Sequence, residues 1–204
     1  MNVNYGIHAF ELQFYSCHIN NIEFDLLWDL MLQCFQSDCM RTYEGQKRLL
    51  SIGNYNVNVI KDKNMLIAFM AWWNFSWCTF IEYIGVRPEY RGQSLAETLL
   101  TSILHENKLT ILEVDNENVK AYMLYSKEGF YVNPFDYTPM DLRHGIRCRQ
   151  KLELMSFPRK LTEDEYRQFI IELHKPQYNT ESSGIKSMDD ERKTSKKKRQ
   201  KDIV

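Results

Sequence analysis

The chain has 204 residues, of which 44% are hydrophobic and 13% aromatic, and its formal net charge is −1. This length and composition predict one folded domain with a short appendage, and they exclude a chain that is disordered throughout. Because the charges nearly balance, a strongly basic nucleic-acid-binding domain is also excluded. The longest apolar run, residues 65–73, is much shorter than the roughly 20 residues that a membrane-spanning helix needs.

The start of the chain and its cysteines indicate a cellular compartment. Residues 1–10 have neither the basic start nor the apolar run of a signal peptide. The five cysteines are odd in number and show no C-x-x-C spacing, which favours reduced thiols over a disulfide framework. His144 and Cys148 have no second pair of ligands at a suitable spacing, so no metal site is expected. We therefore expect a cytoplasmic protein with no membrane partner.

The first third of the chain predicts a strand, two helices and a hairpin. Residues 9–15 alternate weakly between apolar and polar side chains, as a strand does. Residues 23–35 have one apolar helical face, and a second short helix is expected over residues 43–50. Residues 55–60 and 65–75 flank a polar Asp-Lys-Asn turn, which predicts a hairpin. The first helix places on one face Phe24, Leu27, Trp28, Met31 and Phe35.

A strand over residues 79–86 leads into the most informative junction of the chain. Ser94 and Glu97 have the S-x-x-E spacing of a capping box, which predicts that a helix begins near Ser94. The N–H groups of residues 92–96 then converge at the positive end of this helix, where an anion such as a diphosphate binds. An ordinary strand-to-helix connection is the alternative. The helix has an apolar face made of Leu95, Leu99, Leu100, Ile103 and Leu104.

Two commoner phosphate-binding motifs are absent from this junction. A P-loop requires a Lys after the glycine-rich loop, and none is present here. A dinucleotide-binding fold requires G-x-G-x-x-G, but only one Gly lies between Arg91 and Ala96. Nucleoside triphosphates and NAD are therefore not the expected ligands.

A second block of regular structure follows the junction. Residues 111–114 form a short buried strand, and Asn118 begins a helix. Gly129 has the position just after a helix C-terminus, where a left-handed backbone is needed. Phe130 starts another strand, and residues 131–147 are expected to be a loop.

The C-terminal part adds one more helix and a polar tail. After a last strand over residues 150–157, Thr162 and Glu165 form a second capping box, and an apolar stripe follows. This stripe packs either on the same domain or on a second copy of the chain, which would then be a homodimer. Residues 179–204 are polar and basic, which predicts a disordered tail that keeps the chain soluble or contacts an acidic surface or nucleic acid.

The junction resembles motif A of the GCN5-related N-acetyltransferase (GNAT) family. That motif is a strand ending in Val and a pyrophosphate loop Arg/Gln-x-x-Gly-x-Gly/Ala, matched here by Val86 and residues 91–96. The one departure is Ser94, where the family usually has Gly. Residues 118–130 are similar to the family block Asn-x-x-Ala-x-x-x-Tyr-x-x-x-Gly-Phe, with every signature position present. Both blocks, at the family's separation, identify the chain as a GNAT member, with clear resemblance over residues 79–133.

The resemblance implies the fold and the co-substrate. The fold is α/β (α+β), with a mixed, mostly antiparallel central sheet that is splayed in the middle and flanked by helices. The implied parts are a GNAT acetyltransferase domain over residues 1–158, a C-terminal helical extension over residues 159–178 and the basic tail over residues 179–204. The co-substrate is acetyl-coenzyme A (acetyl-CoA), and no metal takes part.

The resemblance also implies where coenzyme A binds. The backbone of the loop holds the pyrophosphate, and Arg91 adds positive charge. The pantetheine arm pairs with the end of the strand, where the N–H of Val86 polarises the thioester carbonyl. Asn118 helps to hold the arm. The implied cofactor-binding residues are Ile84, Gly85, Val86, Arg91, Gly92, Gln93, Ser94, Leu95, Ala96 and Asn118.

Two residues are candidates for proton transfer. Tyr125 matches the family's general acid, the phenol that protonates the departing thiolate, although a Tyr on such a helix also fits plain core packing. By period-two alternation Glu82 shares a strand face with Ile84 and Val86, where it would deprotonate the incoming ammonium directly or through water. A solvated or paired carboxylate is the alternative for Glu82.

The acceptor is not identified by the sequence. Small amines, amino acids, antibiotic amines, and protein N-termini or lysines all fit the segments expected to line its slot. We predict an acetyl-CoA-dependent N-acetyltransferase in which a primary amine attacks the thioester directly in a ternary complex. The competing hypothesis is a coenzyme A-binding sensor or interaction module without turnover. The expected slot residues are Trp28, Tyr43, Phe135, Tyr137, Arg143 and His144.

Overall fold

The computed structural model describes residues 2–5, 8–16, 21–36, 40–105, 107–138 and 152–175. In this part of the chain, eight strands form one sheet in the order β1-β2-β3-β4-β5-β6-β8-β7. The strands are β1 (Asn2–Tyr5), β2 (His8–Ser16), β3 (Tyr55–Asp62), β4 (Met65–Asn74), β5 (Cys78–Val86), β6 (Leu109–Asp115), β7 (Tyr131–Val132) and β8 (Leu152–Phe157). The helices are α1 (Asn21–Cys34), α2 (Tyr43–Leu49), α3 (Leu95–Thr101), α4 (Val119–Lys127) and α5 (Glu163–Leu173), with a 3-10 turn η2 (Pro88–Tyr90).

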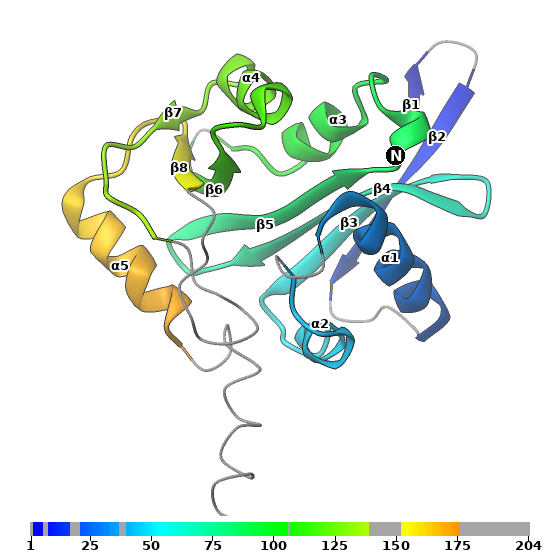
Figure 1. Cartoon of the computed structure of the whole chain (residues 1–204), viewed down its shortest axis with the longest axis horizontal. Coiled ribbons are helices and arrows are strands. Elements are labelled where there is room, and N and C mark those ends of the chain that lie inside the picture. Colours follow the sequence, from blue (N-terminus) through cyan, green and yellow to red (C-terminus); the bar gives the residue numbers. More distant parts are fainter. Residues whose placement is uncertain are drawn as a thin grey trace, which may run out of the picture.

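The predicted fold is confirmed: a mixed sheet, mostly antiparallel, lies between helices (Figure 1). Every neighbouring pair of strands is antiparallel except β5 and β6. The element order also agrees with the prediction, apart from β1, which pairs with β2 and was not predicted. A strand of only four residues has too short a pattern to detect by alternation.

The sheet separates two hydrophobic clusters because successive strand residues point to opposite faces. On β6, Ile111 belongs to the cluster beneath α1, α2 and α5, whereas Leu112 belongs to the cluster beneath α3 and α4. The predicted apolar face of α3 is confirmed, with Leu95 and Leu99 fully buried in the second cluster. The two layers of helices thus hold the sheet from both sides, with α3 and α4 together on one side (Figure 1).

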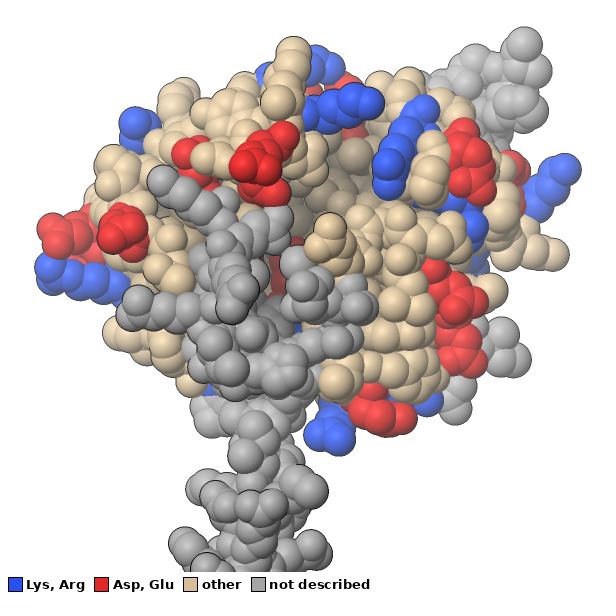
Figure 2. Space-filling view, viewed as in Figure 1, with Lys and Arg blue, Asp and Glu red and all other residues tan. Residues whose placement is uncertain are grey.

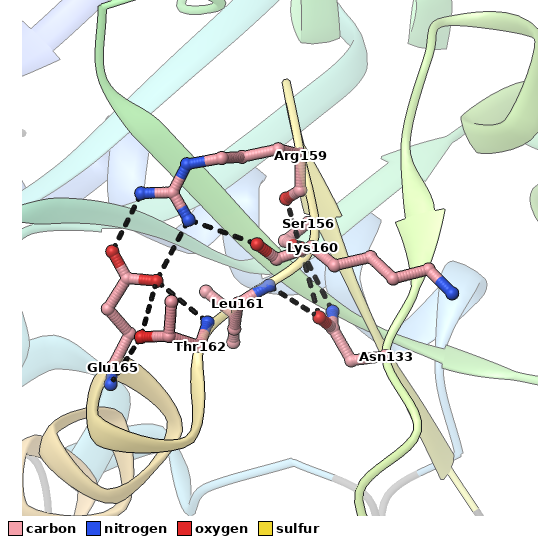
Figure 3. A network of polar contacts seen from close by, with 7 residues as sticks. All are labelled: Asn133, Ser156, Arg159, Lys160, Leu161, Thr162 and Glu165. Atoms are coloured by element: carbon pink, nitrogen blue, oxygen red, sulfur yellow. Dashed lines mark hydrogen bonds and ion pairs between the residues drawn. The ribbon is translucent and has the colours of Figure 1, made fainter.

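Helix α5 packs on this same domain. Phe169 is fully buried, and its ring lies 5.1 Å from that of Phe80 on β5. The predicted capping box is confirmed, since Thr162 and Glu165 bond each other's backbone N–H groups. Figure 3 shows how this cap continues into a polar network, in which Asn133 accepts from the N–H of Leu161 at 2.8 Å. The helix is therefore tied to the β7–β8 end of the sheet.

Some predictions concern residues outside the described ranges. They include the basic tail over residues 179–204 and the candidate slot residues Arg143 and His144, together with Cys148. Within the described residues, no helix has both the length and the apolar character needed to span a bilayer.

Candidate active site

The site lies where β5 and β6 separate. Their parallel pairing runs from Cys78 opposite Leu109 to Ile81 opposite Leu112 and then ends. Beyond this point β5 stays paired with β4, and β6 stays paired with β8. The predicted splay in the middle of the sheet is thus confirmed. Figure 2 shows the face of the molecule on which the two strands separate. This face is hollowed between the helices, and acidic atoms lie deep in the hollow.

The backbone at the end of β5 turns toward this opening. The N–H of Arg87 donates to Ile67 O at 2.8 Å, so the antiparallel alternation directs the N–H and C=O of Ile84 and Val86 away from β4. The Val86 oxygen accepts from Arg91 Nε at 3.1 Å, as this orientation requires. Two strand residues therefore present main-chain groups to the space between β5 and β6, as an added extended chain needs.

Gly85 lets the end of α1 approach β5 closely. A Cβ atom at this position would lie 2.7 Å from Phe69 Cε1 and 2.9 Å from Cys34 Sγ, both closer than real contacts. Cys34 ends α1, and its Sγ lies 3.6 Å from the Val86 oxygen. Burial raises the pKa of this thiol, which opposes ionisation. α1 therefore forms one wall of the opening.

The loop before α3 has two residues in the left-handed region. Gly92 has φ +80° and Ser94 has φ +55°. The predicted capping box is wrong, because the Ser94 side chain makes no cap hydrogen bond. A capping side chain needs an extended backbone, and the left-handed conformation turns it away. Glu97, the expected partner, instead pairs with Lys127 Nζ at 2.9 Å. A Gly at position 94, as in the family motif, would adopt this conformation without strain.

The loop and the end of β5 enclose a recess of about 550 Å³, here called the loop recess. The first hydrogen bond of α3 joins Thr98 N to Ser94 O, so the N–H groups of Leu95, Ala96 and Glu97 precede the helical ladder. All predicted cofactor-binding residues except Gln93 line this recess. Those that do are Ile84, Gly85, Val86, Arg91, Gly92, Ser94, Leu95, Ala96 and Asn118.

Helix α4 supplies Asn118 and Tyr125. Asn118 caps the helix by accepting from Ala121 N at 3.2 Å, which confirms the predicted helix start. Gly129 has φ +85°, as predicted for the residue after the C-terminus. Tyr125 is buried, with its ring 5.9 Å from that of Phe130, and burial raises the pKa of its phenol. This hydroxyl therefore keeps its proton at neutral pH and is suited to be a proton donor.

Glu82 does not share the face of Ile84 and Val86, so this prediction is wrong. A bulge in β5 places Tyr83 opposite Ala71 but Ile81 opposite Trp72, leaving Glu82 as the extra residue. Ile84 and Val86 pack against the cluster beneath α3 and α4, whereas Tyr83 belongs to the other cluster. Alternation does not hold across a bulge, because one added residue shifts every following side chain to the other face.

Arg41 pairs with Glu82 in the interior. Its Nη1 lies 2.5 Å from Glu82 Oε1, and the side chains are only 1% and 3% exposed. The other carboxylate oxygen, Oε2, is buried and has no hydrogen-bond partner among the described residues. Arg41 lies between α1 and α2, outside any regular pattern, so sequence reasoning did not identify it.

Glu113 is a second acidic residue that sequence reasoning left without a role. It lies on β6, and the hydroxyl of Tyr137 donates to its Oε1. Burial, opposed by the hydrogen bond from Tyr137 and reinforced by the charge of Glu82, raises the pKa of Glu113 to about 7. A carboxyl group with this pKa exchanges protons readily at neutral pH. The sequence signal would have been period-two alternation from the buried Leu109 and Ile111.

These carboxylates line a second recess of about 410 Å³, here called the acidic recess. It lies between the diverging ends of β5 and β6. The acidic recess and the loop recess have six lining residues in common, so they meet. The common residues are Cys34, Phe35, Ile84, Asn118, Ala121 and Tyr125. The remaining lining residues of the acidic recess are Gln36, Ile81, Glu82, Tyr83, Leu112, Glu113, Val114, Asp115 and Leu152.

Not every expected slot residue reaches this site. The rings of Trp28 and Tyr43 pack against each other, with centroids 5.6 Å apart, and both rings also pack against Phe24 of α1. Phe135 stacks on Tyr166 of α5 at 4.1 Å. Of the four expected aromatics, only Tyr137 bonds a residue that lines the acidic recess. The other three are packing residues.

Solved structures share this fold. A GNAT-family protein from Bacteroides thetaiotaomicron has a TM-score of 0.69 and 20% identity, covering 82% of this chain and 98% of its own. PaiA N-acetyltransferase from Thermoplasma acidophilum, in complex with coenzyme A, has a TM-score of 0.54 and 15% identity, covering 73% and 98%. Arabidopsis thaliana Naa50, in complex with the bisubstrate analogue CoA-Ac-MVNAL, has a TM-score of 0.54 and 17% identity, covering 72% and 97%.

The sequence comparisons agree with the fold. No match was found among curated protein sequences. The family model described as acetyltransferase (GNAT) family matches residues 23–130, more than half of the chain. This segment runs from α1 through Gly129 and Phe130 and includes β5, the loop before α3 and α4. The chain therefore belongs to the acetyltransferase (GNAT) family.

Proposed function

We propose that this protein is an N-acetyltransferase that transfers the acetyl group of acetyl-CoA to a primary amine by direct attack in a ternary complex. The observation that carries the proposal is the meeting of two recesses at Ile84 and Tyr125. One recess has the backbone groups that suit a phosphorylated, extended donor, and the other has carboxylates that suit an amine. Bound acetyl-CoA supplies an acetyl group activated as a thioester.

The loop recess suits coenzyme A. The N–H groups of residues 95–97 precede the helical ladder, and Arg91 adds a positive charge at the rim. The left-handed Gly92 leaves open space where a Cβ would stand, so a phosphate meets no side chain there. The outward-facing main-chain groups of Ile84 and Val86 would pair with the pantetheine arm, with the Val86 N–H polarising the carbonyl. Asn118 and Gln93 would make further contacts at the edges.

The acidic recess suits the acceptor. An amine enters as an ammonium ion, and a carboxylate removes its proton so that the nitrogen lone pair attacks the thioester carbon. Glu82 keeps the predicted role of general base, and Glu113 is a second candidate because its pKa of about 7 allows proton exchange. When the C–S bond breaks, Tyr125 donates its phenolic proton to the thiolate, and the second proton that the nitrogen loses as the acetamide forms returns to the Tyr125 oxygen. The products are an acetamide and a free thiol.

Relatives support a primary amine as acceptor. The Naa50 structure contains a bisubstrate analogue in which coenzyme A is joined to a peptide, and the PaiA structure contains coenzyme A itself. A small-molecule amine and a peptide amine are both compatible with this support.

A single substitution tests the general acid. Tyr125→Phe should lower thiol release by about 10²–10⁴-fold, because only the proton donor is lost, while the Kd for acetyl-CoA measured by calorimetry stays unchanged. Tyr122→Phe is the matched control, since it lies on the same helix but lines neither recess. Undiminished thiol release by Tyr125→Phe would exclude the role of Tyr125. A wild-type protein that binds acetyl-CoA but releases no thiol with any amine would favour a non-catalytic binding module.

A further inference from the structure

The charged side chains among the described residues that line the acidic recess are all acidic. Its described lining includes three carboxylates and no Lys, Arg or His. Arg41, the cation that pairs with Glu82, is 1% exposed and does not line the recess. Asp115 is engaged by Glu117 N at 2.9 Å, at the outer end of β6. Among the described lining residues, a ligand in the recess therefore meets carboxylate oxygens and no cationic side chain.

Glu82 gives an independent sign that a donor belongs here. Its side chain is 97% buried, and Oε2 has no hydrogen-bond partner among the described residues. Buried polar atoms are nearly always hydrogen-bonded, because an unmade bond costs the full desolvation penalty. Glu82 lines the recess, so a hydrogen-bond donor from a ligand there would satisfy this oxygen. A carboxylate oxygen accepts only, which excludes another acceptor as the partner.

Glu113 lies across the opening from Glu82, and the charge of Glu82 contributes to the raised pKa of Glu113. Oε1 of Glu113 already accepts from Tyr137, so a further donor would be accepted by its second oxygen. An ammonium group has three N–H donors and no acceptor, which matches two neighbouring carboxylates. The same two carboxylates repel an anionic group brought between them.

We propose, on the basis of the proposed N-acetyltransferase function, that the acceptor is a primary amine whose neighbouring carbon bears no carboxylate. In a free α-amino acid, the carboxylate is separated from the amine by a single carbon atom. Placing the nitrogen near Glu82 and Glu113 would then bury a further carboxylate beside them, where the described lining offers no cation to pair with it. Burying an unpaired charge is strongly unfavourable, so free α-amino acids are selected against.

Three matched amines test this selection. Leucine has the carboxylate, leucinamide replaces it with a neutral amide, and 3-methylbutylamine lacks it altogether. We expect kcat/KM for the two analogues that lack the carboxylate to exceed that for leucine by about 100-fold or more, since like charges brought together cost several kcal/mol. The same comparison with phenylalanine, its amide and 2-phenylethylamine controls for the shape of the side chain. A peptide that begins with leucine then distinguishes a free small amine from a chain N-terminus as the source.

A variant separates the effect of the recess from the intrinsic basicity of the amines. Glu113→Gln removes one carboxylate and keeps the shape of the side chain, so the ratio of kcat/KM for leucinamide to kcat/KM for leucine should fall by about tenfold. Glu44 is an exposed acid outside the recess, so Glu44→Gln should leave this ratio unchanged. If Glu113→Gln does not fold, Asp115→Asn makes the same comparison. Leucine used as well as its amide, with thiol release intact, would overturn the charge selection and leave the proposed function standing. No thiol release with any amine would overturn both.

Discussion

The Arg41–Glu82 pair gives the sharpest test of the structure at the site. Because the two side chains are 1% and 3% exposed, water cannot hydrate the charge that remains when one partner is removed. Arg41→Met should therefore destabilise the fold by about 3–5 kcal/mol. For a chain of this size, that corresponds to a fall in Tm of about 6–20 °C. The double variant Arg41→Met/Glu82→Leu should cost less than Arg41→Met alone, because it leaves no buried charge.

The measurement is urea unfolding followed by tryptophan fluorescence, with the free energy of unfolding taken for each variant of the double-mutant cycle. Lys127→Met is the matched control, since it breaks an ion pair of similar length whose side chains are 65% and 31% exposed. Such surface pairs contribute about 0–1 kcal/mol. If Arg41→Met costs no more than Lys127→Met, the Arg41–Glu82 pair is screened by water and the buried geometry is refuted.

Three further predictions concern single residues. Burial raises the pKa of Glu113 from 4.5 to about 7. Between these pH values the folded state holds a proton that the unfolded chain releases, so the free energy of unfolding falls as the pH rises from about 4.5 to 7. Glu113→Gln should abolish about 3 kcal/mol of this fall, measured by urea titrations at about pH 4.5 and 8. Gly85→Ala brings a Cβ to 2.7 Å from Phe69 and should cost about 1–3 kcal/mol, whereas Gly53→Ala enters open space and should cost almost nothing. Ser94→Gly should add about 0.5 kcal/mol of stability, because it relieves a left-handed backbone.

Each of these predictions has a contradicting result. A wild-type stability that does not fall between pH 4.5 and 7 would show that Glu113 is solvated. Equal costs for Gly85→Ala and Gly53→Ala would mean that α1 does not press on β5. A loss of about 1 kcal/mol in Ser94→Ala would indicate a capping hydroxyl, contrary to the absence of a cap bond.

Local patterns predicted most of the elements because each has a period of its own. The helical spacing of Leu95, Leu99 and Leu100 located α3 against the sheet, and these side chains are buried as expected. Thr162 and Glu165 located the start of α5, and Asn118 the start of α4. Such signals depend on neighbours within four residues, so they can be detected without knowing the tertiary structure.

The same reasoning failed where backbone conformation departs from the regular period. The S-x-x-E spacing at Ser94 predicted a cap, but the loop holds Ser94 in the left-handed region, where its side chain cannot reach the helix. Alternation placed Glu82 beside Ile84, but a bulge shifted the strand between them. Neither a bulge nor a positive φ leaves a clear mark on residues that are not Gly.

The sequence alone determined the family resemblance and the positions of the residues expected to hold coenzyme A, because these lie on one continuous stretch from β5 into α3 and on the start of α4. Only the tertiary structure showed that Arg41 pairs with Glu82 and that Tyr137 bonds Glu113. These partners are 41 and 24 residues apart in the chain. They meet because the splay between β5 and β6 opens onto the loops beside it, and no local period encodes a contact between loops and strands so far apart.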